Sequence, residues 1–316
     1  MATDSTGETA LIRTLPGHEF GVTAVAVTPD GQQVVSASWD NTLKVWDLNS
    51  GRELRILSDH GGLVTAVAVT PNGQWAVSAS GDNSLKVWDL ANGSELRTLS
   101  GHTGAVTAVA VTPDGQRAVS ASGDNTLKVW DLASGRELGT LTGHSSYVNG
   151  VAVTPDGQRA VSASWDKILK VWDPASGREF LTLSGHAGAV TGVAVTPDGR
   201  RAVSASWDKT LKVWDLASGR ELLTLFGHTG YVNAVAVTPD GRRAISASWD
   251  KTLKVWDLAS GHDLRTISGH TDAVRAVAVT PDGQWAVSAS ADKTLKVWDL
   301  ASEREVCSNQ PIPSSS

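Results

Sequence analysis

Serine, histidine and aspartate recur along this chain at a spacing that could support nucleophilic catalysis. Seven histidines are each followed by a serine 18 residues later, an aspartate 22 residues later and a tryptophan 28 residues later. A serine activated by a histidine that an aspartate orients is the arrangement of serine hydrolases. The seven sets are His18, Ser36, Asp40, Trp46; His60, Ser78, Asp82, Trp88; His102, Ser120, Asp124, Trp130; His144, Ser162, Asp166, Trp172; His186, Ser204, Asp208, Trp214; His228, Ser246, Asp250, Trp256; and His270, Ser288, Asp292, Trp298.

The elements that must position these side chains repeat with them. Each Trp-Asp pair lies 42 residues from the next, and each unit contains four short segments typical of strands. In the first unit we expect strands at residues 22–27, 34–38, 43–47 and 53–57, with turns at TPDG, around Asp40 and at NSGR. Proline presets φ in such turns, and glycine relieves strain. The first strand, VTAVAV, has apolar or small residues on both sides, which predicts burial on both faces.

The composition agrees with an all-β chain. The 31 glycines and 11 prolines among 316 residues indicate many turns rather than long helices. A net charge of -6 gives no overall attraction to nucleic acid or anionic lipid. The single cysteine, Cys307, excludes an intrachain disulfide and a cysteine metal site. The opening MATDSTGETA is not a signal peptide and no apolar run could span a membrane, so we expect a cytoplasmic protein with no membrane partner.

In order, the motifs GH, PDG, SAS, Asp and WD resemble those of the WD-repeat β-propellers over about residues 10–302. The barely diverged repeats are similar to those of the highly repetitive propellers of cyanobacteria and some other bacteria. The resemblance implies an all-β, seven-bladed β-propeller, in which each blade is a four-stranded antiparallel sheet beside a central channel.

The fold so implied would bring each histidine to its aspartate. The connections between strands two and three, and between strand four and the next blade, emerge at one end of an antiparallel blade, which we call the top face. His18 and Asp40 lie in these connections. The resemblance implies a hydrogen-bond chain from the Trp46 indole through Ser36 and His18 to Asp40, in which each group supplies the donor or acceptor that the next one needs.

Repetition favours a structural role for these sets over catalysis. An active site needs one constellation in one pocket with oxyanion donors, whereas here every blade carries the group and a tryptophan occupies the serine hydroxyl. We therefore predict no catalytic residue and no enzyme. Each histidine belongs to a different blade and faces an aspartate, so we also expect no metal and no cofactor. His262 lies outside the series, in a bottom turn, and we expect it to be solvated.

Some positions carry different residues in otherwise identical blades, so the fold does not require a particular residue there. Three of them are the residue before the turn aspartate and the third and fifth residues after each histidine. In the resembled family these positions often line the top entrance of the channel and contact partners. The partner-binding candidates are Trp39, Tyr147, Asn149, Trp165, Trp207, Tyr231, Asn233, Trp249 and Arg275.

The candidates make an uneven rim. Aromatic residues concentrate in blades four to six, and a lysine follows the turn aspartate in blades four to seven, where blades one to three have asparagine. Exposed aromatics beside cations are typical of peptide and protein contacts, and the cations favour an acidic or phosphorylated ligand. Recent duplication of blades, or packing of the indoles over neighbouring loops, explains the same residues, and both explanations stay open. The lysines are Lys167, Lys209, Lys251 and Lys293.

The first hairpins place arginines at the opposite, bottom end. Nucleic acid could use such a patch. Glutamates in the SGRE turns and the negative net charge favour an ordinary solvated surface instead, so nucleic acid is not a predicted partner. The arginines are Arg117, Arg159, Arg200, Arg201, Arg242 and Arg243.

Together these features predict a non-enzymatic, monomeric scaffold whose top face binds a protein or a peptide. The alternative is a propeller module from a larger signalling protein, or a designed or consensus propeller, with no dedicated ligand. A fold by itself does not name a function, so the choice depends on the top face.

Ring closure is expected to use the N-terminal residues. The sequence ALIRTL at 10–15 matches the fourth-strand sequence ELRTL and precedes the first GH, so it should pair with residues 295–299 as the outer strand of the last blade. The alternative closing strand, EREVC at 303–307, lacks the usual glycine before it and the Thr-Leu ending. We expect a disordered segment at 1–9, one propeller at 10–302 and a loose tail at 303–316.

Overall fold

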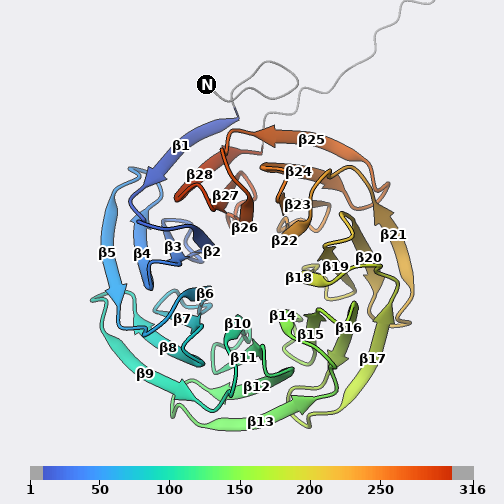
Figure 1. Cartoon of the computed structure of the whole chain (residues 1–316), viewed down its shortest axis with the longest axis horizontal. Helices are drawn as coiled ribbons and strands as arrows, with labels where there is room; N and C mark the ends of the chain where they lie inside the picture. The colour runs from blue at the N-terminus through green and yellow to red at the C-terminus, as the bar shows by residue number, and fades with distance from the viewer. Residues whose placement is uncertain (1–9, 301–316) are drawn as a thin grey trace, which may run out of the picture.

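The computed structural model describes residues 10–300. In this range the chain forms seven four-stranded antiparallel sheets. The sheets stand as blades around a central channel, and blades that follow one another in sequence are neighbours in the ring (Figure 1). Within the described range, no helix is long or apolar enough to cross a membrane.

Each blade has one strand at each of four distances from the channel (Figure 1). The inner strands are β2 (Val22–Val27), β6 (Val64–Val69), β10 (Val106–Val111), β14 (Val148–Val153), β18 (Val190–Val195), β22 (Val232–Val237) and β26 (Val274–Val279). The second strands are β3 (Gln33–Ser38), β7 (Trp75–Ser80), β11 (Arg117–Ser122), β15 (Ala160–Ser164), β19 (Arg201–Ser206), β23 (Arg243–Ser248) and β27 (Trp285–Ser290). The third strands are β4 (Thr42–Asp47), β8 (Ser84–Asp89), β12 (Thr126–Asp131), β16 (Ile168–Trp172), β20 (Leu211–Asp215), β24 (Thr252–Asp257) and β28 (Thr294–Asp299). The outer strands are β1 (Leu11–Pro16), β5 (Glu53–Ser58), β9 (Glu95–Ser100), β13 (Glu137–Thr142), β17 (Glu179–Ser184), β21 (Glu221–Leu225) and β25 (Asp263–Ser268).

Turn chemistry ends the strands where the sequence predicts. The TPDG turn after β2 is closed by a bond from the Gly31 N–H to the Thr28 carbonyl, and the Thr28 hydroxyl donates to Asp30. Gly31 has a φ of 70°, a conformation that costs glycine nothing. In the first unit, β3, β4 and β5 are each one residue longer than expected, and β2 has the expected bounds.

The apolar core lies between the blades rather than within them. Trp46 of blade one packs against Val287 and Leu295 of blade seven, and the equivalent cluster recurs at each blade boundary. The second and third strands are the most buried. The first strand was expected to be buried on both faces, but β2 is only half-buried at four of its six positions. The reason is that side chains of the inner strands, such as Thr23 and Thr65, line a cavity at the centre of the ring.

The ring is closed by β1, which pairs antiparallel with β28. Leu15 lies opposite Leu295, and the N–H of Asp299 donates to the Ala10 carbonyl at 2.8 Å. The last blade therefore takes its outer strand from the opposite end of the described chain. The alternative closing strand at 303–307, the segment at 1–9 and the tail at 303–316 lie outside the described residues.

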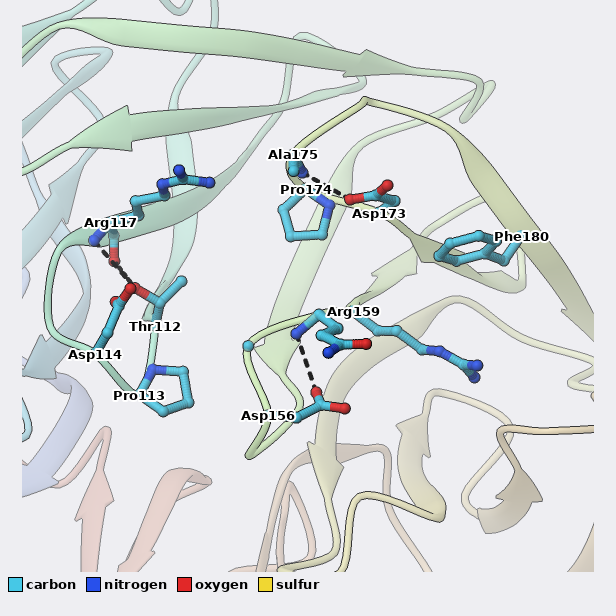
Figure 2. A pocket seen from close by; sticks show the side chains of 12 residues that line it. Thr112, Pro113, Asp114, Arg117, Asp156, Arg159, Asp173, Pro174, Ala175 and Phe180 are labelled. Carbon is cyan, nitrogen blue, oxygen red and sulfur yellow. Dashed lines mark hydrogen bonds between the residues drawn. The ribbon is translucent and has the colours of Figure 1, made fainter.

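One irregularity interrupts the bottom of the repeat in blade four. The other six blades have a leucine after the Trp-Asp pair, and in each of them its N–H donates to the preceding hairpin, as Leu216 does to the Arg200 carbonyl at 2.9 Å. Pro174 stands at this position in blade four and has no N–H to donate. Beside it is a hollow of about 440 Å³, with Thr112 and Asp114 on one side and Pro174 on the other (Figure 2).

Candidate functional site: the top face and the channel mouth

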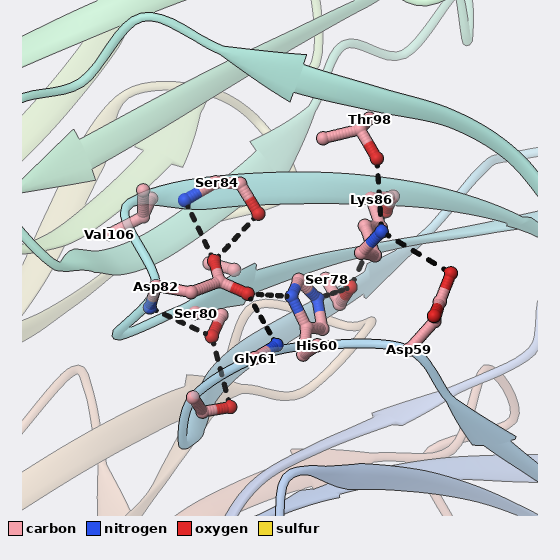
Figure 3. Close-up of polar contacts among 12 residues, drawn as sticks. Asp59, His60, Gly61, Ser78, Ser80, Asp82, Ser84, Lys86, Thr98 and Val106 are labelled. Carbon is pink, nitrogen blue, oxygen red and sulfur yellow. Dashed lines mark hydrogen bonds and ion pairs between the residues drawn. The ribbon is translucent and has the colours of Figure 1, made fainter.

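The repeated serine, histidine, aspartate and tryptophan sets meet in all seven blades. In blade two, His60 Nδ1 lies 2.9 Å from Asp82 Oδ2, and His60 Nε2 lies 2.7 Å from Ser78 Oγ (Figure 3). The Trp88 indole donates to the same Ser78 Oγ at 2.8 Å. In the other blades the equivalent distances lie between 2.7 and 2.8 Å.

The aspartate of each set also holds the two top connections together. Asp82 Oδ2 accepts from the Gly61 N–H at 3.0 Å, and Asp82 Oδ1 accepts from the N–H and hydroxyl of Ser84 at 2.9 and 2.6 Å (Figure 3). The carboxylate thus joins the loop that enters the blade to the turn between β7 and β8. These bonds fix the height and direction of the turn that carries the neighbouring candidate residues.

Burial and hydrogen bonds shift the pKa values of several groups in these sets. Burial lowers the pKa of five of the seven histidines, against the opposing effect of the aspartate: His18, His60, His102, His144 and His270. Burial alone would raise the pKa of Asp124, but hydrogen bonds from Thr126 and His102 outweigh it and lower that pKa to about 2. In these five sets the resulting state is a neutral histidine that donates to a carboxylate.

The geometry keeps substrates away from the serines. Every serine of the sets is completely buried, and its Oγ already contacts both an indole and an imidazole. A substrate carbonyl therefore cannot reach Oγ without displacing the tryptophan. In residues 10–300, no group of three or more histidine, cysteine, aspartate or glutamate residues is placed to hold a metal ion. His262, outside the sets, lies exposed in a bottom turn.

Five of the nine partner-binding candidates form a continuous stack, which we call the aromatic ladder. It runs from Tyr147 through Trp165, Trp207 and Tyr231 to Trp249, with successive ring centroids 5.2, 5.1, 5.2 and 5.4 Å apart. The ladder crosses blades four, five and six. Trp207 is half-buried, and the other four rings are exposed, from 38% for Tyr231 to 49% for Tyr147.

Backbone bonds and a small residue make the ladder continuous. The N–H of Trp165 donates to the Tyr147 carbonyl at 2.9 Å, and the N–H of Trp249 donates to the Tyr231 carbonyl at the same distance. These bonds place each tyrosine beside the tryptophan of its own blade. Blade five has Ala189 where its neighbours have tyrosine, and there Trp165 contacts Trp207 directly. Sequence reasoning found the rings but not their contact with one another.

The other four candidates line one cavity together with the three tryptophans of the ladder. A cavity of about 270 Å³ at the top of the channel, the channel mouth, is lined by residues of all seven blades. Trp39, exposed by 37%, lines it together with Arg275, whose guanidinium lies 4.0 Å from the Trp39 ring centroid. Its lining residues are Thr23, Trp39, Thr65, Thr107, Asn149, Trp165, Thr191, Trp207, Asn233, Trp249 and Arg275.

A bond between neighbouring blades explains the fifth position after the histidines. The Thr23 hydroxyl of blade one donates to the Val64 carbonyl of blade two at 2.7 Å. Asn233 makes the equivalent bond to the Val274 carbonyl at 2.8 Å. Sequence reasoning assigned Asn233 to partner binding and missed this contact, although the recurrence of threonine at the position was a signal for it. The other residues that make the bond are Thr65, Thr107 and Thr191.

The lysines after the turn aspartates are exposed, but their backbone is unfavourable. Lys209 has a φ of 71°, and the other three have values from 70° to 74°. Asn41, Asn83 and Asn125 adopt the same left-handed conformation in blades one to three, and asparagine tolerates it better than lysine does. The lysines therefore occupy positions where folding alone favours another residue.

Some of the bottom arginines also connect blades. Arg159 donates to the Leu216 carbonyl at 2.7 Å, and Arg201 donates to the Leu258 carbonyl at 3.2 Å. Arg200 and Arg242 are exposed. Some arginines of the bottom surface thus have a structural role that the sequence did not predict, and others are exposed as on an ordinary solvated surface.

The repeat pattern matches one protein family along nearly the whole chain. The family described as "WD domain, G-beta repeat" matches residues 9–47, 51–89, 93–131, 135–173, 177–215, 219–257 and 261–299. The chain belongs to the WD-repeat family. WD-repeat propellers are typically protein-interaction scaffolds rather than enzymes, in line with the inaccessible serines.

Similarity to individual proteins is limited to short stretches. Small ribosomal subunit protein RACK1 of Caenorhabditis elegans is 48% identical over 44 residues, which are 14% of this chain and 14% of that protein. Cross-pathway control WD-repeat protein 2 of Flammulina velutipes is 49% identical over 43 residues, again 14% of each chain. The chain thus spans about a seventh of the length of these relatives, close to one repeat. The resemblance to bacterial propellers stays a prediction.

Proposed function

We propose that this WD-repeat propeller is a non-enzymatic scaffold that binds a protein or peptide through its top face. The observation that supports this most directly is the aromatic ladder, because four of its five rings are substantially exposed although they stack on one another. Aromatic side chains give large contact areas at low entropic cost, and they dominate binding energies in protein interfaces.

The support beneath the ladder favours binding further. The aspartates of the sets fix the turns that carry the tryptophans, so little conformational entropy remains to be lost on binding. Lys167, Lys209 and Lys251 follow these turns and are exposed. They favour an acidic or phosphorylated partner, whose binding would weaken as salt rises.

The test is a pull-down that compares three forms of the chain. The wild type, the variant Trp165→Ala/Trp207→Ala/Trp249→Ala and the bottom variant Arg200→Ala/Arg242→Ala are each immobilised at equal amounts, after circular dichroism shows that all are folded. We expect the ladder variant to lose partners that both other forms retain. Each anchoring indole is worth about 2 kcal/mol, or roughly a thirtyfold loss in affinity. A folded ladder variant that keeps every partner would overturn the proposal.

A further inference from the structure

Arg275 occupies, in blade seven, the fifth position after the histidine. In five of the other six blades, the residue at this position forms a hydrogen bond to the next blade. Threonine or asparagine at this position donates to the carbonyl of the next blade in blades one, two, three, five and six. In blade seven the next carbonyl in the ring belongs to Val22, and Arg275 makes no such bond. Blade seven thus gives up a bond between blades and places a cation in the channel mouth instead.

The Arg275 cation lacks a counter-charge at hydrogen-bonding distance. No ion pair or hydrogen bond of its guanidinium is present within residues 10–300, and its Nε is both buried and without a partner. The side chain is half-buried and stacks on Trp39. Asp272 is near enough to oppose, but not to cancel, the effect of burial, which lowers the pKa of Arg275. Guanidinium stays protonated at neutral pH, so a partly desolvated positive charge remains uncompensated.

Asn149 is the second exception in the same cavity. Its side-chain nitrogen is buried without a partner, whereas its counterpart in blade six, Asn233, donates to the next blade. The channel mouth therefore holds two side chains with unused donors, and indoles supply the apolar part of its lining. Unpaired donors beside apolar walls suit a ligand that carries both an acceptor and an apolar body.

We propose that the channel mouth binds a carboxylate of an acidic linear peptide, with Arg275 as its ion-pair partner and Trp39 as the surface that holds the guanidinium in place. Guanidinium recognises carboxylates through two parallel N–H donors, and the stack on Trp39 fixes the plane of that fork. A cavity of about 270 Å³ accommodates a side chain and its neighbours rather than a folded domain. This inference rests on the proposed function, because the rest of the peptide would lie on the aromatic ladder.

The repeat supplies the matched variants. Arg275→Thr restores the residue of four other blades, and its hydroxyl can donate to the Val22 carbonyl, so the fold should be preserved or stabilised. Arg275→Lys keeps the charge but loses the planar fork and the stack. Thr65→Ser is the control variant: it changes a residue of the cavity lining in another blade, but it keeps the hydroxyl and does not alter the charge.

The experiment selects binders from a random twelve-residue peptide library displayed on phage, using the wild type, Arg275→Thr and the triple ladder variant as baits. We expect the wild type to enrich aspartate or glutamate at one position, and Arg275→Thr to enrich similar neutral residues without that acidic position. One selected peptide is then synthesised with glutamate, glutamine or phosphoserine there. The wild type should bind the glutamine peptide about tenfold more weakly than the glutamate peptide. The loss of affinity should be smaller for Arg275→Lys, and Arg275→Thr should bind both peptides equally well.

The outcomes separate the two proposals. Equal acidic enrichment with the wild type and Arg275→Thr, or a glutamine penalty that survives in Arg275→Thr, would overturn the role of Arg275. A phosphoserine peptide that binds more tightly than the glutamate peptide would make phosphate the ligand and would also overturn the carboxylate assignment. No enrichment over the triple ladder variant would instead contradict peptide binding by the top face itself.

Discussion

Trp207 and Tyr231 stack across the boundary between blades five and six, with ring centroids 5.2 Å apart and ring planes inclined by 20°. On its other side Trp207 contacts Trp165 of blade four at 5.1 Å. Trp207 therefore has an aromatic neighbour on each side. Trp249 lies at the end of the ladder and contacts only one other ring of the ladder, that of Tyr231. Packing, one of the explanations left open by the sequence, thus applies more to Trp207 than to Trp249.

This difference predicts unequal effects of truncation on stability. Trp207→Ala removes two ring contacts and should lower the free energy of unfolding by about 1–3 kcal/mol, whereas Trp249→Ala removes one and should cost about 0.5–1.5 kcal/mol. Urea unfolding followed by circular dichroism measures both. If both variants lowered the free energy of unfolding equally, the contacts between rings would contribute nothing to stability beyond the burial of each ring.

The repeat made the fold predictable from the sequence, but it did not predict some of the contacts at the top face. Identical spacing of His60, Ser78, Asp82 and Trp88 with their counterparts indicated which groups must meet, because the strand order alone places them together. The contact between Trp165 and Trp207 was not predictable, since it depends on the side-chain conformations of the two indoles, which the repeat spacing does not specify. Half-burial of the inner strands was also missed, because apolar or small residues on both sides of a strand do not reveal that one side lines a cavity.

The left-handed backbone of the lysines predicts a stabilising substitution. Lys209→Asn should raise the free energy of unfolding by about 0.5–1 kcal/mol, because asparagine tolerates a φ of 71° better than lysine does. The reverse change, Asn83→Lys in blade two, should destabilise by a similar amount. Thermal unfolding tests both, and a loss of stability in Lys209→Asn would show that the lysine side chain contributes more to the fold than its conformation costs.

Removing the carboxylate of one set should destabilise the protein without revealing an activity. Asp208→Ala strips His186 and Thr210 of their acceptor and should cost about 1–3 kcal/mol, as should Asp250→Ala in the next blade. Glu19→Ala, at an exposed position, serves as the control. If either aspartate variant kept its stability but lost a hydrolytic activity of the wild type, the structural role would be wrong.

The pKa shifts of the sets predict a loss of stability in acid. Five buried histidines have a pKa below their ordinary value of 6.5 in the folded chain, so the unfolded chain binds more protons and stability falls as the pH drops below about 6.5. Depressed aspartate pKa values, such as about 2 for Asp124, act in the same direction below about pH 4. Each additional proton bound by the unfolded chain contributes a slope of about 1.4 kcal/mol per pH unit.

Urea midpoints measured from pH 4 to pH 8 test this dependence. The midpoint should rise steeply with pH up to about 6.5 and then level off, since the histidines are neutral in both states above their ordinary pKa. A variant with His60→Gln should show a shallower rise, because one titrating group is gone. A midpoint independent of pH between 4 and 6.5 would contradict the assignment of neutral, buried histidines.

Closure of the ring by β1 predicts that one leucine near the N-terminus matters as much as a leucine inside a blade. Leu15 is completely buried opposite Leu295, and Leu57 occupies the equivalent place opposite Leu43 in blade one. Leu15→Ala and Leu57→Ala should each cost about 2–5 kcal/mol, whereas Ile12→Ala, at an exposed position of β1, should change stability by less than about 0.5 kcal/mol.

The two leucine variants should nevertheless differ in how the protein opens. The strand β1 pairs with β28, which lies at the far end of the described chain, so no turn joins the two strands of this pair. In contrast, a short turn joins β5 directly to its partner β4. Hydrogen exchange should therefore show lost protection confined to β1 and β28 in Leu15→Ala, and a more uniform loss in Leu57→Ala. Unchanged exchange in β1 and β28 of the Leu15→Ala protein would mean that this pairing does not hold the ring closed.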